Sequence, residues 1–267
     1  MRYAKGSLQL SKSQDYPLLR QVLRSEFATQ SQLYEFMRLR LKERSRRSFD
    51  WRLRRLIKHQ LVERYSVPSF PSDLVCTIAP HGAVVLQGLG EYCLFSSRRG
   101  DERRQQFNVV HALELNDLHL SLLRVEPTAR WTYATDIRSQ NELTRFGYAK
   151  DYDAVILYRI AGQEVRLALE YERTPKAMKQ YEDIAGCLGR EVQIDCLLYL
   201  MPNYDLLNFV AGFFAKVKLP VYFGLSRDWH AHLLEMQVIY PPSPSLVPLS
   251  DLLKTLVQEP QLKLLRG

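Results

Sequence analysis

Residues 45–60 read SRRSFDWRLRRLIKHQ, and this stretch decides how the first third of the chain is interpreted. Its apolar residues Phe49, Leu53, Leu56 and Ile57 recur at helical spacing, which predicts a helix with one buried face. Most of the other positions are basic, so the same helix has a positively charged outer side. Seven basic residues in this helix or just before it are therefore candidates for binding DNA: Arg44, Arg46, Arg47, Arg52, Arg54, Arg55 and Lys58.

The segments around the basic helix predict a small domain. Pro17 lies in the first turn of a helix, and Thr29 is expected to cap a second, amphipathic helix. Residues 27–29 are interpreted as a short break between these two helices. After the basic helix, apolar runs at 61–65 and 74–78 predict two strands that are joined by a turn rich in proline and serine, and a helix is expected to follow at about 81–95. Two helices, a basic helix and a two-stranded wing form the order of a winged helix-turn-helix, which places its third helix in the major groove of DNA.

The charge of the chain is concentrated in this domain. Residues 1–80 carry 16 lysines and arginines against 7 acidic residues, whereas residues 81–267 carry 21 against 22. A one-signed excess at the position of a recognition helix favours double-stranded DNA as the partner. Two alternatives remain open, a solvated charged helix and a winged domain that contacts protein.

Different basic residues of the helix are expected to have different roles. The first residues of a recognition helix enter the groove, so Arg46, Arg47 and Ser48 are candidates for reading base edges. Arg52, Arg55 and Lys58 are candidates for contacting phosphates.

Composition excludes several classes of protein. The hydrophobic fraction of 46% is typical of a folded domain, and no window approaches the roughly 20 apolar residues that span a bilayer. The first residues lack the apolar core of a signal peptide. The four cysteines are widely spaced and the six histidines do not cluster, so we expect reduced thiols and a cytoplasmic protein without a zinc site.

The second half of the chain alternates between strands and helices. An amphipathic helix is expected at 109–124 and a strand at 131–137. Two further strands, at 151–160 and 165–173, are joined by a tight turn, and helix, strand, helix and strand follow. This order predicts a three-layer α/β sandwich. The domains are expected at 1–96 for the winged helix, 97–106 for a linker, 107–240 for the α/β domain and 241–267 for a tail with a short helix.

Acidic residues on the two strands suggest a nuclease-like site. Asp153 begins one strand, and Glu170 and Glu172 project from one face of the next, as in the PD-(D/E)xK nuclease core. Carboxylates of this kind bind Mg²⁺ or Mn²⁺, so Asp153 and Glu170 are the candidate metal ligands. The lysine of that motif is replaced by Glu172, which leaves Lys176 or Lys179 to reach back from the following helix. Alternatively, these acids are ordinary surface carboxylates at strand ends.

Two short motifs, HALELNDL at 111–118 and EYERT at 170–174, resemble those of the replication-relaxation family of plasmids and mobile elements. Residues 111–118, HALELNDL, are similar to the family's H-x-L-x-x-N-D-L helix. Residues 170–174, EYERT, are similar to its E-x-D/E-R-G-T strand end without the glycine, and Tyr152 stands in place of its proline. The resemblance implies a winged helix followed by a nuclease-like domain, and DNA binding in replication or maintenance of a mobile element.

The helix that carries the first motif contributes further candidates. In nuclease cores of this kind the first helix often adds an acid to the metal site, which makes Glu114 and Asp117 candidate site residues. His111 is also compatible with a core histidine, and Asn116 and Asp117 with hydrogen bonds to a neighbouring loop.

These observations lead to three hypotheses. The first is a double-stranded DNA-binding protein that acts in replication, maintenance or transcription control and has a degenerate nuclease domain used for dimerisation or partner contact. The second is an active Mg²⁺-dependent DNA endonuclease targeted by its winged helix. The third is a regulator whose two domains both contact proteins.

Overall fold

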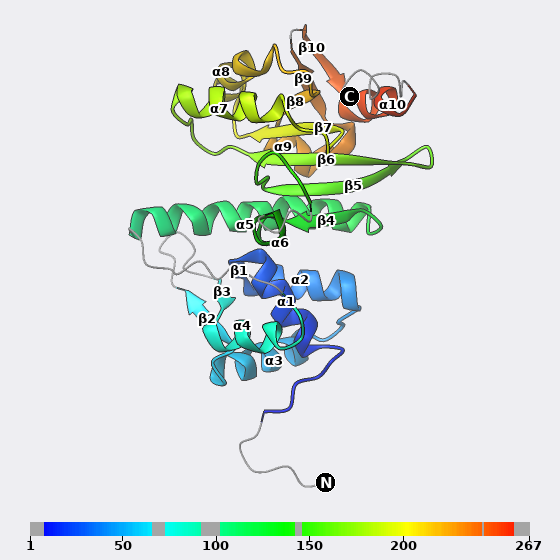
Figure 1. The fold of residues 1–267 in the computed structure, drawn as a ribbon. Helices are drawn as coiled ribbons and strands as arrows, with labels where there is room; N and C mark the ends of the chain where they lie inside the picture. Colours follow the sequence, from blue (N-terminus) through cyan, green and yellow to red (C-terminus); the bar gives the residue numbers. More distant parts are fainter. Residues whose placement is uncertain (1–7, 66–72, 92–101, 142–145, 242, 259–267) are drawn as a thin grey trace. The chain divides into compact units, whose positions relative to one another are not determined.

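The computed structural model of the 267-residue chain describes residues 8–65, 73–91, 102–141, 146–241 and 243–258. The chain divides into two compact units, residues 1–120 and residues 121–267 (Figure 1). In the described residues, no helix is long and apolar enough to cross a membrane.

The first unit combines helices with a small antiparallel sheet, as the sequence predicts. The three strands are ordered β1-β3-β2, so the last strand lies between the other two. In chain order the elements that precede the long helix α5 are α1 (Asp15–Ser25), β1 (Ala28–Thr29), α2 (Gln30–Leu41), α3 (Arg46–Lys58), β2 (Val62–Tyr65), β3 (Val75–Ile78) and α4 (Pro80–Gln87).

Local sequence signals start the helices. The side chain of Thr29 accepts from the backbone amide of Gln32, whose side chain accepts in return from Thr29, and this capping box begins α2. Ser45 caps α3 by accepting from the amide of Ser48 at 3.1 Å. Both helices therefore begin where the sequence predicts.

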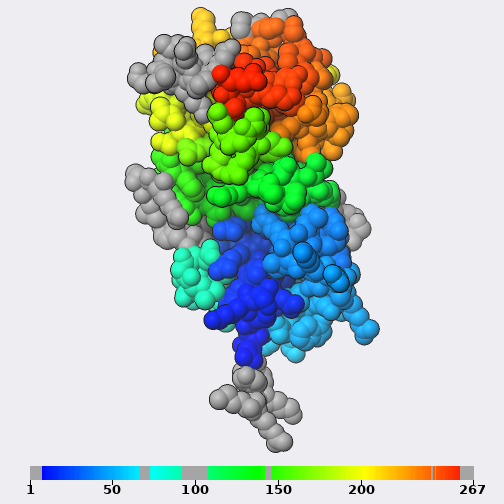
Figure 2. Space-filling model, turned by 90° about the vertical axis from the view of Figure 1, so that its right-hand side faces the viewer, coloured from blue at the N-terminus to red at the C-terminus, as the bar shows by residue number. Residues whose placement is uncertain are grey.

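The core of the first unit is formed by one face of each of its helices. Figure 2 shows α1 in dark blue between α2 and the cyan α4, and α1 contacts both of these helices and β3. The apolar spacing of α3 is confirmed, because its core positions are buried against this framework. The largest buried side chains here are Leu18, Leu19, Leu33, Phe36, Phe49, Leu53 and Leu56.

Two details of the first unit differ from the sequence-based expectation, and a third concerns residues that the structure does not describe. Residues 28–29, interpreted as a break, form strand β1 and pair with β3. The helix expected at 81–95 is α4, which ends at Gln87. The expected Pro/Ser turn at 67–72 lies outside the described residues.

Helix α5 (Glu102–Val125) occupies part of the segment expected to be a linker. Residues 97–101 lie outside the described part, but residues 102–106 are helical. The side chain of Gln32 donates to the backbone oxygen of Leu113 at 2.8 Å, and Asn116 donates to the oxygen of Phe27 at 2.7 Å. These hydrogen bonds hold α5 to α2 and to the turn before β1, which explains why α5 up to Leu120 belongs to the first unit.

The second unit is built on a mixed sheet of seven strands, ordered β10-β9-β8-β7-β6-β5-β4. Strands β6, β7 and β8 are parallel, and the others pair antiparallel; β5 and β6 form the long hairpin at the right of Figure 1. Its elements are β4 (Arg130–Tyr133), α6 (Ala134–Asn141), β5 (Ala154–Ile160), β6 (Gln163–Tyr171), α7 (Met178–Leu188), β7 (Cys196–Met201), α8 (Tyr204–Phe214), β8 (Val221–Leu225), α9 (Ser226–His232), a 3-10 turn (Leu233–Glu235), β9 (Gln237–Tyr240), β10 (Ser243–Pro248) and α10 (Leu249–Gln258).

Strand alternation gives this sheet two buried faces. Ala168 of β6 and Tyr199 of β7 belong to a core that includes buried residues of α7 and α8. Leu169 and Leu198, the next positions along the same strands, are also fully buried and point to the opposite side. Helix α10 contacts β5 and β6, and α9 contacts β7 and β8.

Two segments of the second unit differ from the sequence-based expectation. The strand expected at 131–137 ends at Tyr133, and the chain continues as α6. The expected tail at 241–267 contributes β10 to the sheet and α10 to the packing, where Leu249 and Leu253 are fully buried. The leucines of this tail therefore dock on the chain's own second unit, up to the last described residue at 258.

Candidate functional site

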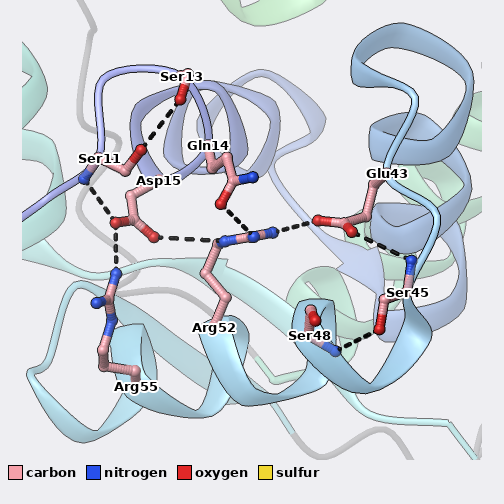
Figure 3. Close-up of polar contacts among 9 residues, drawn as sticks. All are labelled: Ser11, Ser13, Gln14, Asp15, Glu43, Ser45, Ser48, Arg52 and Arg55. Atoms are coloured by element: carbon pink, nitrogen blue, oxygen red, sulfur yellow. Dashed lines mark hydrogen bonds and ion pairs between the residues drawn. The ribbon is translucent and has the colours of Figure 1, made fainter.

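Arg52 of α3 is buried in a polar network on the inner side of the helix, although the sequence predicts that it contacts a phosphate. Only 7% of the residue is exposed. Its guanidinium donates to Glu43 at 2.7 Å and to Gln14 at 2.6 Å, and lies 3.7 Å from Asp15 (Figure 3). Arg52 is therefore committed to partners inside the first unit, which disfavours the predicted phosphate contact.

Arg55 lies one turn further along α3 and is held by the same acid. Its guanidinium donates to the fully buried carboxylate of Asp15, which also accepts from the backbone amide of Ser11 at 2.7 Å. The Arg55 guanidinium also lies over the ring of Trp51, 5.0 Å from the ring centroid. Arg55 is half-buried and already paired, so it is a poorer candidate for a phosphate than its exposed neighbours.

Glu43 completes the network from the segment between α2 and α3. Burial raises the pKa of Glu43, but hydrogen bonds from the Arg52 side chain and from the backbone amides of Ser45 and Arg44, together with the charge of Arg52, outweigh it. The pKa of Glu43 consequently lies below its ordinary value. The ionised carboxylate is thus the form that stabilises the start of α3.

The opposite side of α3 faces solvent and is basic. Arg47, Trp51, Arg54 and Lys58 are spaced by four, three and four residues, so they share one side of the helix. All four are exposed. The three cations form no hydrogen bond or ion pair with another described residue. We call these four residues the outer face of α3.

The remaining predicted DNA contacts flank this face. Arg46 is exposed but donates to Asp50 at 2.9 Å, and its guanidinium lies 5.0 Å from the ring centroid of Tyr34. Arg44 precedes α3 and is exposed. Of the seven basic residues selected from the sequence, five are therefore exposed, and Arg52 and Arg55 support the fold.

In the second unit, the structure brings together the three acids selected from the sequence. Ala154 is the register partner of Leu169, which places Asp153 beside the end of β6. The backbone amide of Tyr171 donates to the carboxylate of Asp153 at 2.8 Å. Glu170 lies on β6 and Glu172 follows directly after its last residue, and both are buried. The spacing argument for these three residues therefore describes their positions correctly.

Each of the two glutamates has a lysine partner. Lys150, in the segment before β5, donates to Glu170, and Lys176, in the segment before α7, donates to Glu172. Lys150 also lies 4.7 Å from the ring centroid of Tyr152. We refer to Asp153, Glu170, Glu172, Lys150 and Lys176 as the carboxylate–lysine cluster.

The charges of the cluster are adjusted by burial and by one another. Burial raises the pKa of Glu170, the charge of Lys150 lowers it, and the neighbouring Asp153 raises it, so that the pKa remains above its ordinary value. Burial lowers the pKa of Lys176, but the hydrogen bond to Glu172 and the surrounding carboxylates outweigh it, so this pKa is raised. Each lysine therefore partly neutralises a carboxylate that would be costly to bury alone.

Tyr199 of β7 lies beside the cluster. It is the register partner of Glu170, it is fully buried, and its hydroxyl has no hydrogen-bond partner among the described residues. Burial raises the pKa of Tyr199 far above its ordinary value, and the charges of Glu170, Glu172 and Asp153 raise it further. The tyrosine hydroxyl is therefore neutral and faces an electronegative environment.

Other candidates selected from the sequence do not join this cluster. Lys179 is exposed on α7, and Lys176 is the lysine that reaches Glu172. Asp117 of α5 accepts from Gln32 at 2.7 Å within the first unit. Glu114 is half-buried on the same helix. The hydrogen bond to a neighbouring loop that the sequence suggested is observed for Asn116, which donates to the oxygen of Phe27, whereas Asp117 accepts from helix α2.

Lys150 and Tyr199 were missed by sequence analysis. Lys150 lies outside any periodic segment, so its pairing with Glu170, 20 residues away, is not visible in the local pattern. Tyr199 is one residue in the apolar run 196–201, and that run indicates only a buried strand.

The arrangement of the cluster does not fit a divalent metal. Glu170 and Glu172 are each engaged by a lysine ammonium, and Asp153 accepts from a backbone amide. Among the described residues, no group of three or more acidic, histidine or cysteine side chains is placed to hold a metal ion. A divalent cation would have to displace both ammonium groups before it could bind the two glutamates.

No protein-family model matches the chain, and no curated protein matches it significantly.

Proposed function

We propose that the first unit is a winged helix-turn-helix that binds double-stranded DNA through the outer face of α3. The order α1, β1, α2, α3, β2, β3 supports this fold, because α3 follows α2 at the position of a recognition helix. The observation that carries the proposal is the outer face itself. Arg47, Arg54 and Lys58 are exposed on one side of a helix and have no acidic partner among the described residues.

The outer face of α3 carries only positive charge. A helix surface that serves only solubility usually mixes both signs of charge, whereas a phosphate-binding surface has one sign. The two acids that contact the inner side of α3 support this distinction. Asp15 and Glu43 are engaged by Arg52 and Arg55, so they neutralise the inner side of the helix and leave the outer face positive.

We further propose that the second unit is a nuclease-like domain that does not cleave DNA. Asp153 directly precedes β5, and Glu170 lies on the neighbouring strand β6. This placement of two acids supports a relationship to the PD-(D/E)xK core. The two lysine pairs support loss of the metal, because they occupy the carboxylates that a metal would need. The proposed process is replication control or maintenance of a mobile element, in line with the resemblance of residues 111–118 and 170–174 to the replication-relaxation family.

The proposal is tested with supercoiled plasmid and purified protein in Mg²⁺ or Mn²⁺, beside reactions with EDTA and with the Glu170→Ala variant. We expect a mobility shift of the plasmid in all reactions with wild-type protein and no nicked product in any. Nicking that requires the metal and is lost in Glu170→Ala would contradict the non-catalytic assignment. Absence of any shift would contradict DNA binding.

A further inference from the structure

Trp51 is placed where an apolar side chain is least expected. It lies on the outer face of α3, on the side opposite the buried Phe49, Leu53 and Leu56, and 62% of it is exposed. Covering the indole would remove a large apolar area from water, because a tryptophan offers some 150–250 Å² on burial. A partner that contacts the outer face therefore gains most from this side chain.

The indole is also held in place before any partner binds. The guanidinium of Arg55 lies over its ring at 5.0 Å, and the buried carboxylate of Asp15 holds that guanidinium from the other end. Asp15 itself is fixed by the backbone amide of Ser11. This chain of contacts from a buried acid to a surface ring reduces the conformational entropy that Trp51 would lose on binding.

The surroundings of Trp51 identify the chemistry of the partner. Arg47 lies one turn before it, Arg54 nearly one turn after it, and Lys58 two turns after it, all on the same side. Three cations around one aromatic ring are suited to a polyanion that also offers an apolar contact. In duplex DNA the phosphates supply the charge, and the C5-methyl group of thymine supplies the apolar contact in the major groove.

We propose that Trp51 is a specificity-determining residue that contacts the C5-methyl group of a thymine in the major groove. This inference rests on the proposed DNA binding by α3 and adds the base that the helix prefers. Duplex DNA is favoured over a single strand because the outer face carries one aromatic side chain on a convex helix. Platforms for single strands stack successive bases on several rings along a groove.

The test removes only the methyl group. Wild-type protein is used to select duplexes from a random 20-base-pair pool, and the selected duplex is resynthesised with deoxyuridine in place of each thymine in turn. We expect one or two positions at which the substitution weakens binding by about fourfold, the effect of burying one methyl-sized group. At those positions Trp51→Ala should bind the thymine and deoxyuridine duplexes equally well.

Two variants separate the methyl contact from other effects. Trp51→Phe keeps an apolar ring and should retain part of the thymine preference. Trp51→Ala should keep the thermal unfolding temperature of the wild type, because the removed side chain is mostly exposed. It should also keep the salt dependence of binding, because the cations remain.

The outcomes distinguish this inference from the proposed function. Duplex binding in which Trp51→Ala retains the thymine preference, or in which deoxyuridine has no effect at any position, overturns the role of Trp51 alone. Tighter binding of a 20-nucleotide single strand that is lost in Trp51→Ala also overturns it, since it assigns Trp51 to base stacking. Failure to bind any duplex at 50 mM salt overturns the proposed function itself.

Discussion

Arg52 Nη1 donates to Glu43 Oε2 across 2.7 Å and thereby joins the buried side of α3 to the segment that follows α2. The same guanidinium reaches Gln14 and lies near Asp15, so it connects three parts of the first unit. The basic residues of α3 are thus divided by the fold. Some hold the helix in place, and the others are left for a partner.

Replacing Arg52 by alanine should destabilise the first unit by about 3 kcal/mol, because the change leaves the buried Asp15 and the half-buried Glu43 without this cation. Denaturant unfolding followed by circular dichroism measures the loss. A decrease below about 0.5 kcal/mol, the range typical of surface substitutions, would show that the network is not structural.

Arg54→Ala is the matched control, since Arg54 lies two residues away on the outer face and makes no ion pair with a described residue. We expect its unfolding free energy to stay within about 0.5 kcal/mol of the wild type. Its affinity for duplexes of any sequence should fall to a similar extent, because a phosphate contact carries no base preference. A loss confined to one sequence would instead assign Arg54 to base recognition.

The stability of the first unit should decrease in acid in a way that depends on Glu43. The pKa of Glu43 is lower in the folded chain than its ordinary value, so its stabilising effect is complete above the unfolded pKa, about 4.3, and is lost as the pH falls through the folded pKa. Melting temperatures of wild type and Glu43→Gln, measured from pH 7 to pH 3, should differ at neutral pH and converge in acid. If the melting temperatures of the two proteins differ by the same amount at every pH, the ionised Glu43 does not stabilise the first unit.

Lys150→Ala should destabilise the second unit at pH 7 by about 3 kcal/mol, because Glu170 would remain buried without its partner. Adding Glu170→Gln to this variant should recover part of the loss, since a neutral amide is less costly to bury. The comparison of both single variants and the double variant by denaturant unfolding measures the coupling. If the effects of the two substitutions on the unfolding free energy simply add, the interaction between Lys150 and Glu170 does not stabilise the second unit.

Tyr199→Phe should leave the second unit as stable as the wild type or stabilise it by about 1 kcal/mol, because a buried hydroxyl without a partner among the described residues is removed. The phenyl ring keeps the contacts with Phe214 and Phe223. Thermal unfolding tests this expectation. A clear loss of stability would reveal a hydrogen bond that Tyr199 needs.

Much of the first unit follows from local sequence signals. The capping residue Thr29 predicts the start of α2, and the helical spacing of Phe49, Leu53 and Leu56 predicts α3 where it is found. Strand β1 was missed because two residues give no alternating pattern. Arg52 was assigned to phosphate by charge, although it lies three residues after Phe49 and four before Leu56, on their side of the helix. For Arg52, the position on the buried side of the helix is a better guide to its role than its charge.

The carboxylate–lysine cluster was predicted only in part. The alternation of β6 places Glu170 and Glu172 on one face, and the tight turn brings Asp153 beside them. Lys176 is one of the two lysines that the sequence offers for this role, but Lys150 does not follow from these patterns, because it approaches from the irregular segment before β5. Their side chains decide whether the acids are open to a metal, so the chemistry of this site depends on the part that local patterns do not reveal.

The most direct test of the central claim compares the salt dependence of duplex binding by the wild type and by the Arg47→Ala/Arg54→Ala/Lys58→Ala variant. Fluorescence anisotropy of a labelled 20-base-pair duplex of mixed sequence gives Kd at 50, 100 and 200 mM salt. We expect the wild type to lose about 10³-fold in affinity over this range, and the variant to bind more weakly with a slope smaller by about 2–3, one per lost phosphate contact. Equal slopes, or no binding by the wild type at 50 mM salt, would contradict DNA binding through the outer face of α3.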